Sequence, residues 1–340
     1  MGITTVGGSS STSTAAGTTF KDLIEKVYRR VMGGVRERAV QLVGDIQSSD
    51  VSITLSGSQV SAMFPGVVLS IEMEMLYVIS WDSTKNIAVV QRGYLGSTAT
   101  GHNDKTLCYI NPRYSRYDIG VEINDDLRSL SSHSNGMFRV GVAEITYNPV
   151  FQGYDLGDLP DNFIDVLEIR YKIAPPTRSF PPIRKWKVVR WNTSVTDSAF
   201  PSGRGLIIYE SGWPGLPMIV TYSAPFIRLV DPADGVFNTP GSNDEAAPHN
   251  GYSSTVYANG VPNLTPTMLD LPPLGAEIDL TLPREISRNF IDSQPDPRKA
   301  QEVPANAIAA SVNSLMTRRA QRIAEEADRL QRQYTKVRAW

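Results

Sequence analysis

The C-terminal stretch of residues 304–336 constrains the fold more than any other part of the chain. Its apolar side chains recur at steps of three and four residues, which predicts one long amphipathic helix: Ile308, Val312, Leu315, Met316, Ala320, Ile323, Ala327, Leu330 and Tyr334. Pro304 suits the first turn, because a proline lacks the N–H group that would be unpaired there. A helix of this length spans about 50 Å, and its apolar stripe must be covered by its own domain or by another chain.

The opposite face of this predicted helix is rich in arginine. Residues 284–340 carry eleven basic and seven acidic side chains, whereas residues 231–279 carry seven acidic side chains and neither Lys nor Arg. The end of the chain is therefore electrostatically distinct from the body. Such localised positive charge favours docking of the helix on a partner over packing on its own domain.

Short strand patterns fill most of the chain before residue 230. Apolar and polar residues alternate, or β-branched and aromatic residues cluster between turn signals, in nine segments: 51–55, 69–75, 77–81, 87–91, 107–110, 166–172, 185–190, 205–210 and 217–223. The polar turn at residues 82–86 makes the third and fourth segments a hairpin. Pro and Gly breaks leave no room for helical crossovers between the last four, which predicts a small antiparallel sheet or sandwich.

Helical signals are fewer. Thr19 and Asp22 resemble a capping box before a helix that ends at Gly33-Gly34, and a second helix is predicted over residues 35–43. The sequence also predicts a short helix near residues 124–130 and an extended stretch at 138–147. Residues 156–160 are predicted to form a linker.

These patterns predict an α+β fold with an N-terminal helix, an antiparallel β-rich body with a small β-sandwich-like module, and a long C-terminal amphipathic helix. We expect six segments along the chain. They are a flexible Gly/Ser/Thr arm (1–19), a helical segment (20–47), the β-rich body with a short helix (48–155), the antiparallel β module (156–230), an acidic loop (231–262) and a C-terminal arm (263–340).

Composition excludes several classes of protein. The 340 residues have a formal charge of −2, which argues against binding nucleic acid non-specifically through the whole surface. Cys108 stands alone, so neither an intramolecular disulfide nor a cysteine-based zinc site is expected. Neither a membrane span nor a secretory signal is evident, so we expect a soluble protein of a reducing compartment.

Chemistry-bearing motifs are absent. The sequence has no G-x-S-x-G, P-loop, H-E-x-x-H, G-x-G-x-x-G or EF-hand pattern, so we expect no catalytic residues, no cofactor and no metal. His102, His133 and His249 are far apart, and we interpret each as an exposed loop histidine. Adjacent helical residues point in different directions, so the acid pairs at 125–126 and 325–326 are interpreted as solvated faces.

One local pattern follows the predicted strand at residues 87–91. The sequence R-G-Y-L-G-S-T-A, with a histidine three residues on, contains Arg92, Gly93, Gly96, Thr98 and His102. It resembles the "R-G-x-x-G-T-x-A-x-x-H" turn of head–tail connectors and other neck or tail proteins of tailed bacteriophages, with Ser97 where threonine is commoner. The glycines allow tight turns, and Ser97 and Thr98 can cap nearby N–H groups, so we assign this turn to structure.

A second pattern lies near the C-terminus. It comprises L-P-P-L-G at 271–275, R-N-F at 288–290, D-P-R at 296–298, E-V-P at 302–304 and the arginine-rich helix. It resembles the C-terminal arm of actinophage-type head-to-tail connector (adaptor) proteins. The two patterns cover about residues 67–130 and 264–336.

The resemblance implies a non-enzymatic virion protein of the neck, assembled in the host cytoplasm. Copies of such a protein form a ring, usually of twelve, that caps the portal protein and adjoins a tail-terminator or other neck protein; genomic DNA passes through without sequence-specific binding. The terminal helix would dock on the portal, through residues that we expect to be Ile308, Val312, Leu315, Arg319, Arg322, Ile323, Arg329, Leu330 and Arg332.

Two alternatives stay open. The β-rich middle would also suit a tail-terminator, minor tail or baseplate protein. A carbohydrate-binding or peptidoglycan-active protein would use Trp186, Trp191 and Trp213 as sugar platforms, although tryptophans in strands more often pack in a core.

Overall fold

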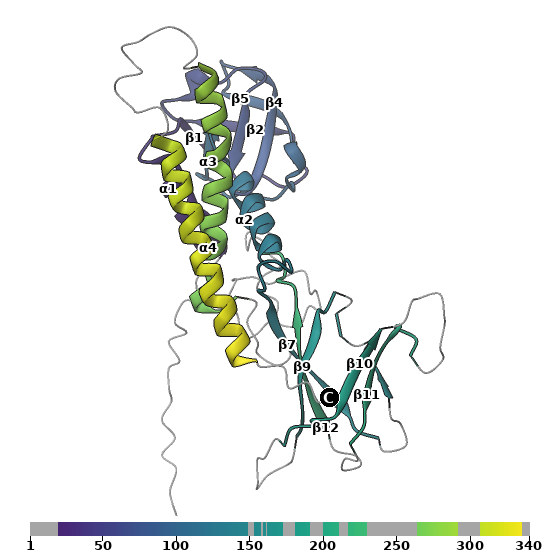
Figure 1. Cartoon of the computed structure of the whole chain (residues 1–340). Helices are drawn as coiled ribbons and strands as arrows, with labels where there is room; N and C mark the ends of the chain where they lie inside the picture. The colour runs from purple at the N-terminus through teal and green to yellow at the C-terminus, as the bar shows by residue number, and fades with distance from the viewer. Residues whose placement is uncertain are drawn as a thin grey trace, which may run out of the picture.

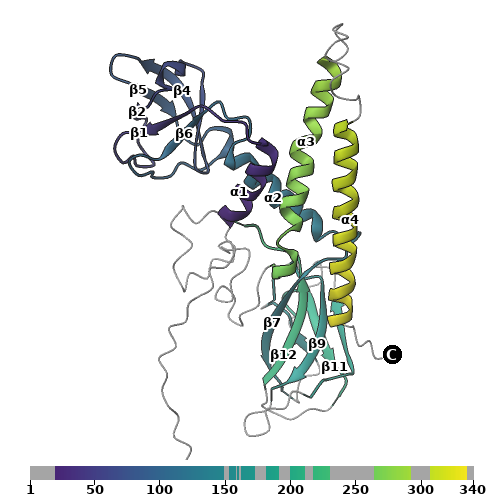
Figure 2. The ribbon, with the colours of Figure 1, turned by 90° about the vertical axis from the view of Figure 1, so that its left-hand side faces the viewer.

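The computed structural model describes residues 20–148, 153–157, 159–160, 162–172, 181–190, 200–210, 217–229, 264–291 and 307–334. The fold is α+β, as predicted: a six-stranded barrel and a β-sandwich are joined by a layer of helices. Figures 1 and 2 show the barrel at one end of the helical layer and the sandwich at the other. The expected N-terminal arm and acidic loop lie outside the described residues.

The barrel is built from short antiparallel strands. They close in the order β1-β2-β5-β4-β3-β6, with bounds β1 Ala39–Leu42, β2 Ser52–Ser56, β3 Val68–Ile71, β4 Glu74–Asp82, β5 Ile87–Gln91 and β6 Leu107–Ile110. Alternate side chains point inward and fill the interior with Val, Leu, Ile and Cys108, so the barrel encloses a packed core. Short 3-10 turns lie at Val60–Ala62 and Tyr94–Gly96.

Two predictions for this region were wrong. Residues 35–43 do not form a helix, because 39–42 pair with β2 and β6 and bury Val40 and Leu42 in the barrel. The strand predicted at 69–75 is two strands, since the chain reverses between β3 and β4 at Glu72, whose φ is 50°. Because of this reversal the side chain of Glu74 is buried. Alternation along a single strand had predicted that Glu74 would lie on the polar, exposed face.

Four helices make the middle layer. They are α1 Phe20–Met32, α2 Arg116–Leu130, α3 Leu271–Ile291 and α4 Ala307–Gln333. Ser115 caps α2 in a capping box with Asp118, which starts the helix eight residues earlier than predicted. Apolar faces of all four helices meet in one core, and α3, which the sequence reading missed, contacts α1, α2 and α4.

The sandwich is formed by two three-stranded antiparallel sheets around one core. Their orders are β7-β12-β9 and β10-β11-β8, with bounds β7 Arg139–Thr146, β8 Gly153–Asp155, β9 Asp165–Tyr171, β10 Trp186–Arg190, β11 Arg204–Ile208 and β12 Pro217–Ala224. The four strands predicted between 166 and 223 are confirmed. The boundary predicted at 155/156 is wrong, because β7 pairs with β12 along eight residues and β8 pairs with β11. The predicted linker holds Leu156 and Leu159, which are buried in the sandwich core.

Candidate functional site

The turn that follows β5 is organised by the side chain of Arg92. Its Nε and Nη2 atoms each donate to a carboxylate oxygen of Glu74 at 2.7 Å, a bidentate pair. Nη2 also donates to the carbonyl of Thr100 at 2.5 Å, and Nη1 donates to the carbonyls of Gln47 at 2.7 Å and Asp50 at 3.0 Å. One guanidinium therefore ties the turn to β4 and to the β1–β2 connection.

His102 completes this network from the far end of the turn. Its Nδ1 lies 3.0 Å from a carboxylate oxygen of Glu72, and its Nε2 lies 2.9 Å from one of Glu74. Because both ring nitrogens face carboxylates, the arrangement fits an imidazolium that donates from each. Burial acts to lower the pKa of His102, but the two carboxylates outweigh it and raise the pKa above its usual value. The prediction of an exposed loop histidine was wrong, since the side chain is 1% exposed.

Glu74 is the hub of the network. Burial acts to raise its pKa, yet hydrogen bonds from Arg92, His102 and the Thr100 N–H outweigh burial and lower the pKa to about 2. With the Glu74 carboxylate fully buried and His102 almost so, the cluster leaves no room for a substrate. We therefore interpret the network as an internal staple that holds the turn to the barrel, which agrees with the structural assignment of the sequence pattern.

The remaining residues of the pattern shape the backbone. Gly93 has φ of 62°, and a Cβ atom there would lie 3.0 Å from the carbonyl of Ser97; Gly96 has φ of 84°. The Ser97 hydroxyl accepts from the N–H of Met75 on β4 at 2.9 Å, so it caps a distant strand and not the nearby N–H group that was expected. Thr98 is exposed.

The apolar stripe of α4 is covered largely by the chain's own helices. Ile323 and Leu330 are buried in the core shared with α1 and α2, and Val312 is also buried. Leu315 is half-buried, and the side chain of Ile308 lies outside the described residues. At these buried positions the prediction that α4 docks on a partner was wrong, because the chain's own helices already cover its apolar stripe.

The arginines predicted as docking anchors also have internal partners. Arg319 binds Asp126 of α2, and Arg322 binds Asp270 and Glu326. Arg329 pairs with Glu326 at 2.9 Å, whereas the pair of Arg332 with Asp328 is exposed. The predicted solvated faces are likewise corrected: Asp126 and Glu326 are buried and charge-paired, because helix packing encloses one member of each acidic pair.

A groove of about 760 Å³ lies between α2, α3, α4 and the turn at residues 133–136. The carboxylate of Asp126 lies in its wall against Gly275, where a Cβ atom would approach the carboxyl carbon within 2.0 Å, so the position requires glycine. Burial raises the pKa of Asp126 to about 6 despite the neighbouring Arg319. Sequence reasoning missed this groove, since its residues are about 150 positions apart along the chain; the glycine inside L-P-P-L-G was its one local signal.

Other candidate chemistry is not supported. Trp186 packs half-buried against the sandwich core, whereas Trp191 and Trp213 lie outside the described residues. Cys108 is inside the barrel, and burial raises the pKa of its thiol to about 12, so it is a poor nucleophile. Within the described ranges, no three His, Cys, Asp or Glu side chains gather in a way that would hold a metal ion. None of the described helices combines the length and apolarity needed to cross a membrane.

No protein-family model matches the chain, and no curated protein matches it significantly.

Proposed function

We propose that the chain is a structural protein of a tailed-phage virion, a head-to-tail adaptor that forms a ring on the portal. The proposal places it in the neck, joined to the portal on one side and to a tail-terminator or other neck protein on the other, with DNA passing through the ring. It assigns the chain no enzymatic activity and no cofactor.

The observation that carries the proposal is the stapled turn at residues 92–102. Arg92, Gly93 and His102 of the phage-like pattern all bind Glu74 on the barrel, and Gly96 supplies a positive φ in the same turn, so one structure needs all four residues. A turn held by buried charges keeps one geometry, which suits a protein whose task is to present fixed surfaces to neighbours. The barrel, helical layer and sandwich supply such surfaces at both ends of the molecule (Figure 2).

The portal contact must use the exposed part of α4 rather than its buried stripe. Met316, Arg318 and Arg332 are exposed on this helix, and Arg318 has no ion-pair partner among the described residues. Arg318 and Arg332 lie about four helical turns apart on the same face of α4, so they suit an acidic surface on a partner. We assign the portal-facing role to Arg318 and Arg332, since Met316 lines the groove between α2, α3 and α4.

The test is light scattering of the purified chain with the portal protein encoded in the same genome. We expect a complex of defined mass that is weakened by the double substitution Arg318→Glu with Arg332→Glu, both exposed on α4. The control is Lys185→Glu with Lys187→Glu, on the sandwich, which should leave the complex intact.

Other outcomes would assign the chain elsewhere. Binding to purified tails but not to the portal would make it a tail-terminator, minor tail or baseplate protein. Binding to neither, with thermal stabilisation by peptidoglycan fragments or other glycans, would overturn the virion proposal in favour of a carbohydrate-binding protein.

A further inference from the structure

An acidic surface runs along α2 and onto α3. Asp118, Glu122 and Asp125 follow at steps of four and three, so they share one face of α2. Burial raises the pKa of Glu122, and the negative charges of Asp279 on α3, Asp125 and Asp118 raise it further. Asp125 and Asp279 are exposed and have no ion-pair partner among the described residues.

This surface borders the 760 Å³ groove, which contains an unsatisfied carboxylate oxygen. Asp126 has a side chain that is 3% exposed; its Oδ1 accepts from Arg319, whereas its buried Oδ2 has no hydrogen-bond partner among the described residues. Asp126 and Asp279 both line the groove, beside Ile278 and the exposed Met316. A buried acceptor without a donor is costly, so the groove is suited to a cationic donor that also brings apolar surface.

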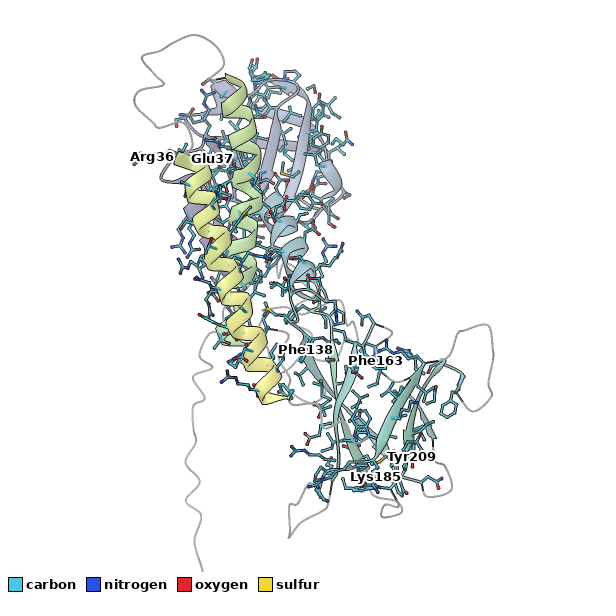
Figure 3. The ribbon with its side chains drawn as sticks, in the orientation of Figure 1. Arg36, Glu37, Phe138, Phe163, Lys185 and Tyr209 are labelled. Carbon is cyan, nitrogen blue, oxygen red and sulfur yellow. The ribbon has the colours of Figure 1, made fainter. Side chains whose placement is uncertain are left out.

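The chain presents such a surface on its barrel. Arg36, Arg38 and Arg113 surround a pocket of about 270 Å³, flanked by Val35 and Phe64, which are 58% and 55% exposed. The three arginines are exposed and form no ion pair with a described residue. Glu37 is the acid beside them (Figure 3).

Glu37 forms no ion pair with these arginines among the described residues. Its two carboxylate oxygens accept from the hydroxyl of Tyr28 at 2.7 Å and from the backbone N–H of Arg113 at 2.9 Å. Three guanidinium groups face one carboxylate, so the pocket has a net positive rim around an apolar centre. We call it the arginine rim, and the acidic surface with its groove the acidic groove.

We propose that the acidic groove of one copy of this chain binds the arginine rim of the next copy. The two surfaces are opposite in charge, and each has an apolar centre. No residue lines both pockets, and no ion pair joins the two surfaces among the described residues, so the proposed contact joins different copies. A contact between two different patches is heterologous and repeats from copy to copy, which generates a ring or a filament. This deepens the proposed function, on whose ring it rests, by naming the subunit contact.

The test reverses the charge of each surface separately. One variant carries Asp125→Arg with Asp279→Arg, and the other carries Arg36→Glu with Arg38→Glu; all four positions are exposed, so the fold should persist by circular dichroism. In light scattering at low salt, the wild-type chain should assemble, and each variant alone should associate at least about tenfold more weakly. An equimolar mixture of the two variants should assemble again, because every contact then pairs opposite charges.

Lys185→Glu with Lys187→Glu is the matched control, and it should assemble like the wild-type chain. Raising the salt to about 0.5 M should weaken the wild-type assembly, since exposed charges are screened. An independent readout mixes an Asp125→Cys chain with an Arg38→Cys chain, which a bifunctional thiol reagent should crosslink; Cys108 is buried and serves as background.

Two results would overturn the inference: a wild-type chain that stays monomeric at low salt, or an assembly that both charge reversals leave unchanged. Failure of the proposed function gives a different pattern. A chain that assembles and shows the rescue in the mixture, yet binds neither portal nor tail, would keep this contact and remove the virion role.

Discussion

At the scale of single residues, Glu74 shows how much one buried carboxylate can organise. It accepts from Arg92 twice, from His102, and from the backbone N–H groups of Gly93 and Thr100. These donors come from both ends of the turn at 92–102, so the turn depends on one side chain of β4. Removing its charge would leave the guanidinium of Arg92 buried without a counter-ion.

Glu74→Gln should therefore destabilise the protein by about 3–5 kcal/mol, the usual cost of breaking a buried ion pair on one side. The matched control is Glu72→Gln, whose carboxylate is 40% exposed and can be replaced by water. Urea unfolding followed by tryptophan fluorescence measures both. Equal, small losses in the two variants would contradict the role of Glu74 as the hub.

His102 predicts a pH dependence. Its folded pKa is raised, so its contribution to stability is complete below its unfolded pKa of about 6.5 and is lost as the pH rises through the folded value. The pKa of Glu74 is lowered to about 2, so its contribution is complete above about pH 5 and is lost as the pH falls. The network should be most stable between about pH 5 and 6.5.

The urea midpoint of the wild-type protein should fall between pH 6 and pH 9, and His102→Gln should remove much of that fall. His133→Gln, at an exposed histidine, is the control and should behave like the wild-type chain. An unchanged slope in His102→Gln would show that His102 is not charged in the folded protein.

At the scale of elements, α4 has two kinds of surface. Ile323 packs into the core shared with α1 and α2, whereas Met316, two turns earlier, is 41% exposed. The same helical stripe thus contains both core residues and residues available to a partner. Periodicity identifies the stripe, but only the packed neighbours of α4 separate its two parts.

Ile323→Ala should cost about 2–5 kcal/mol, because it leaves a cavity in the helical core. Met316→Ala should change the free energy of unfolding by less than about 0.5 kcal/mol, as expected for an exposed site. Thermal unfolding by circular dichroism at 222 nm compares the two. Similar losses would mean that Met316 is also held in the core and is not free for a partner.

At the scale of the whole molecule, three separate cores stabilise the described parts of the chain. One fills the barrel, one lies among the helices, and one lies between the sheets of the sandwich. Leu206 and Val220, for example, belong to the sandwich core and to neither of the other two cores. Separate cores predict separate cooperative units.

Calorimetry should therefore resolve more than one unfolding transition. Leu206→Ala, in the sandwich core, should lower the midpoint of one transition and leave the transitions of the other cores near their wild-type temperatures. Leu69→Ala, in the barrel core, is the complementary variant and should lower the midpoint of a different transition. A single transition that both variants lower equally would show that the modules unfold as one unit.

The sequence by itself determined local features of the fold, namely secondary-structure elements and turns. Period-two and period-3.6 patterns placed most strands and the first and last helices, because those patterns follow from backbone geometry alone. Glycines in the turn at 92–102 were identifiable, since φ values of 62° and 84° suit few other residues. The absence of familiar catalytic motifs was also readable from the chain.

Tertiary structure decided which polar groups are buried and which apolar groups remain exposed. From the sequence, Glu74 and His102 were both predicted to be surface residues. The chain reversal at Glu72 buries Glu74 against His102, which is 28 positions away along the chain. Asp126 and Arg319 are 193 positions apart, and helix packing makes them one pair. Burial depends on contacts between distant segments, so local periodicity identified the apolar stripe of α4 without revealing that the chain itself covers most of it.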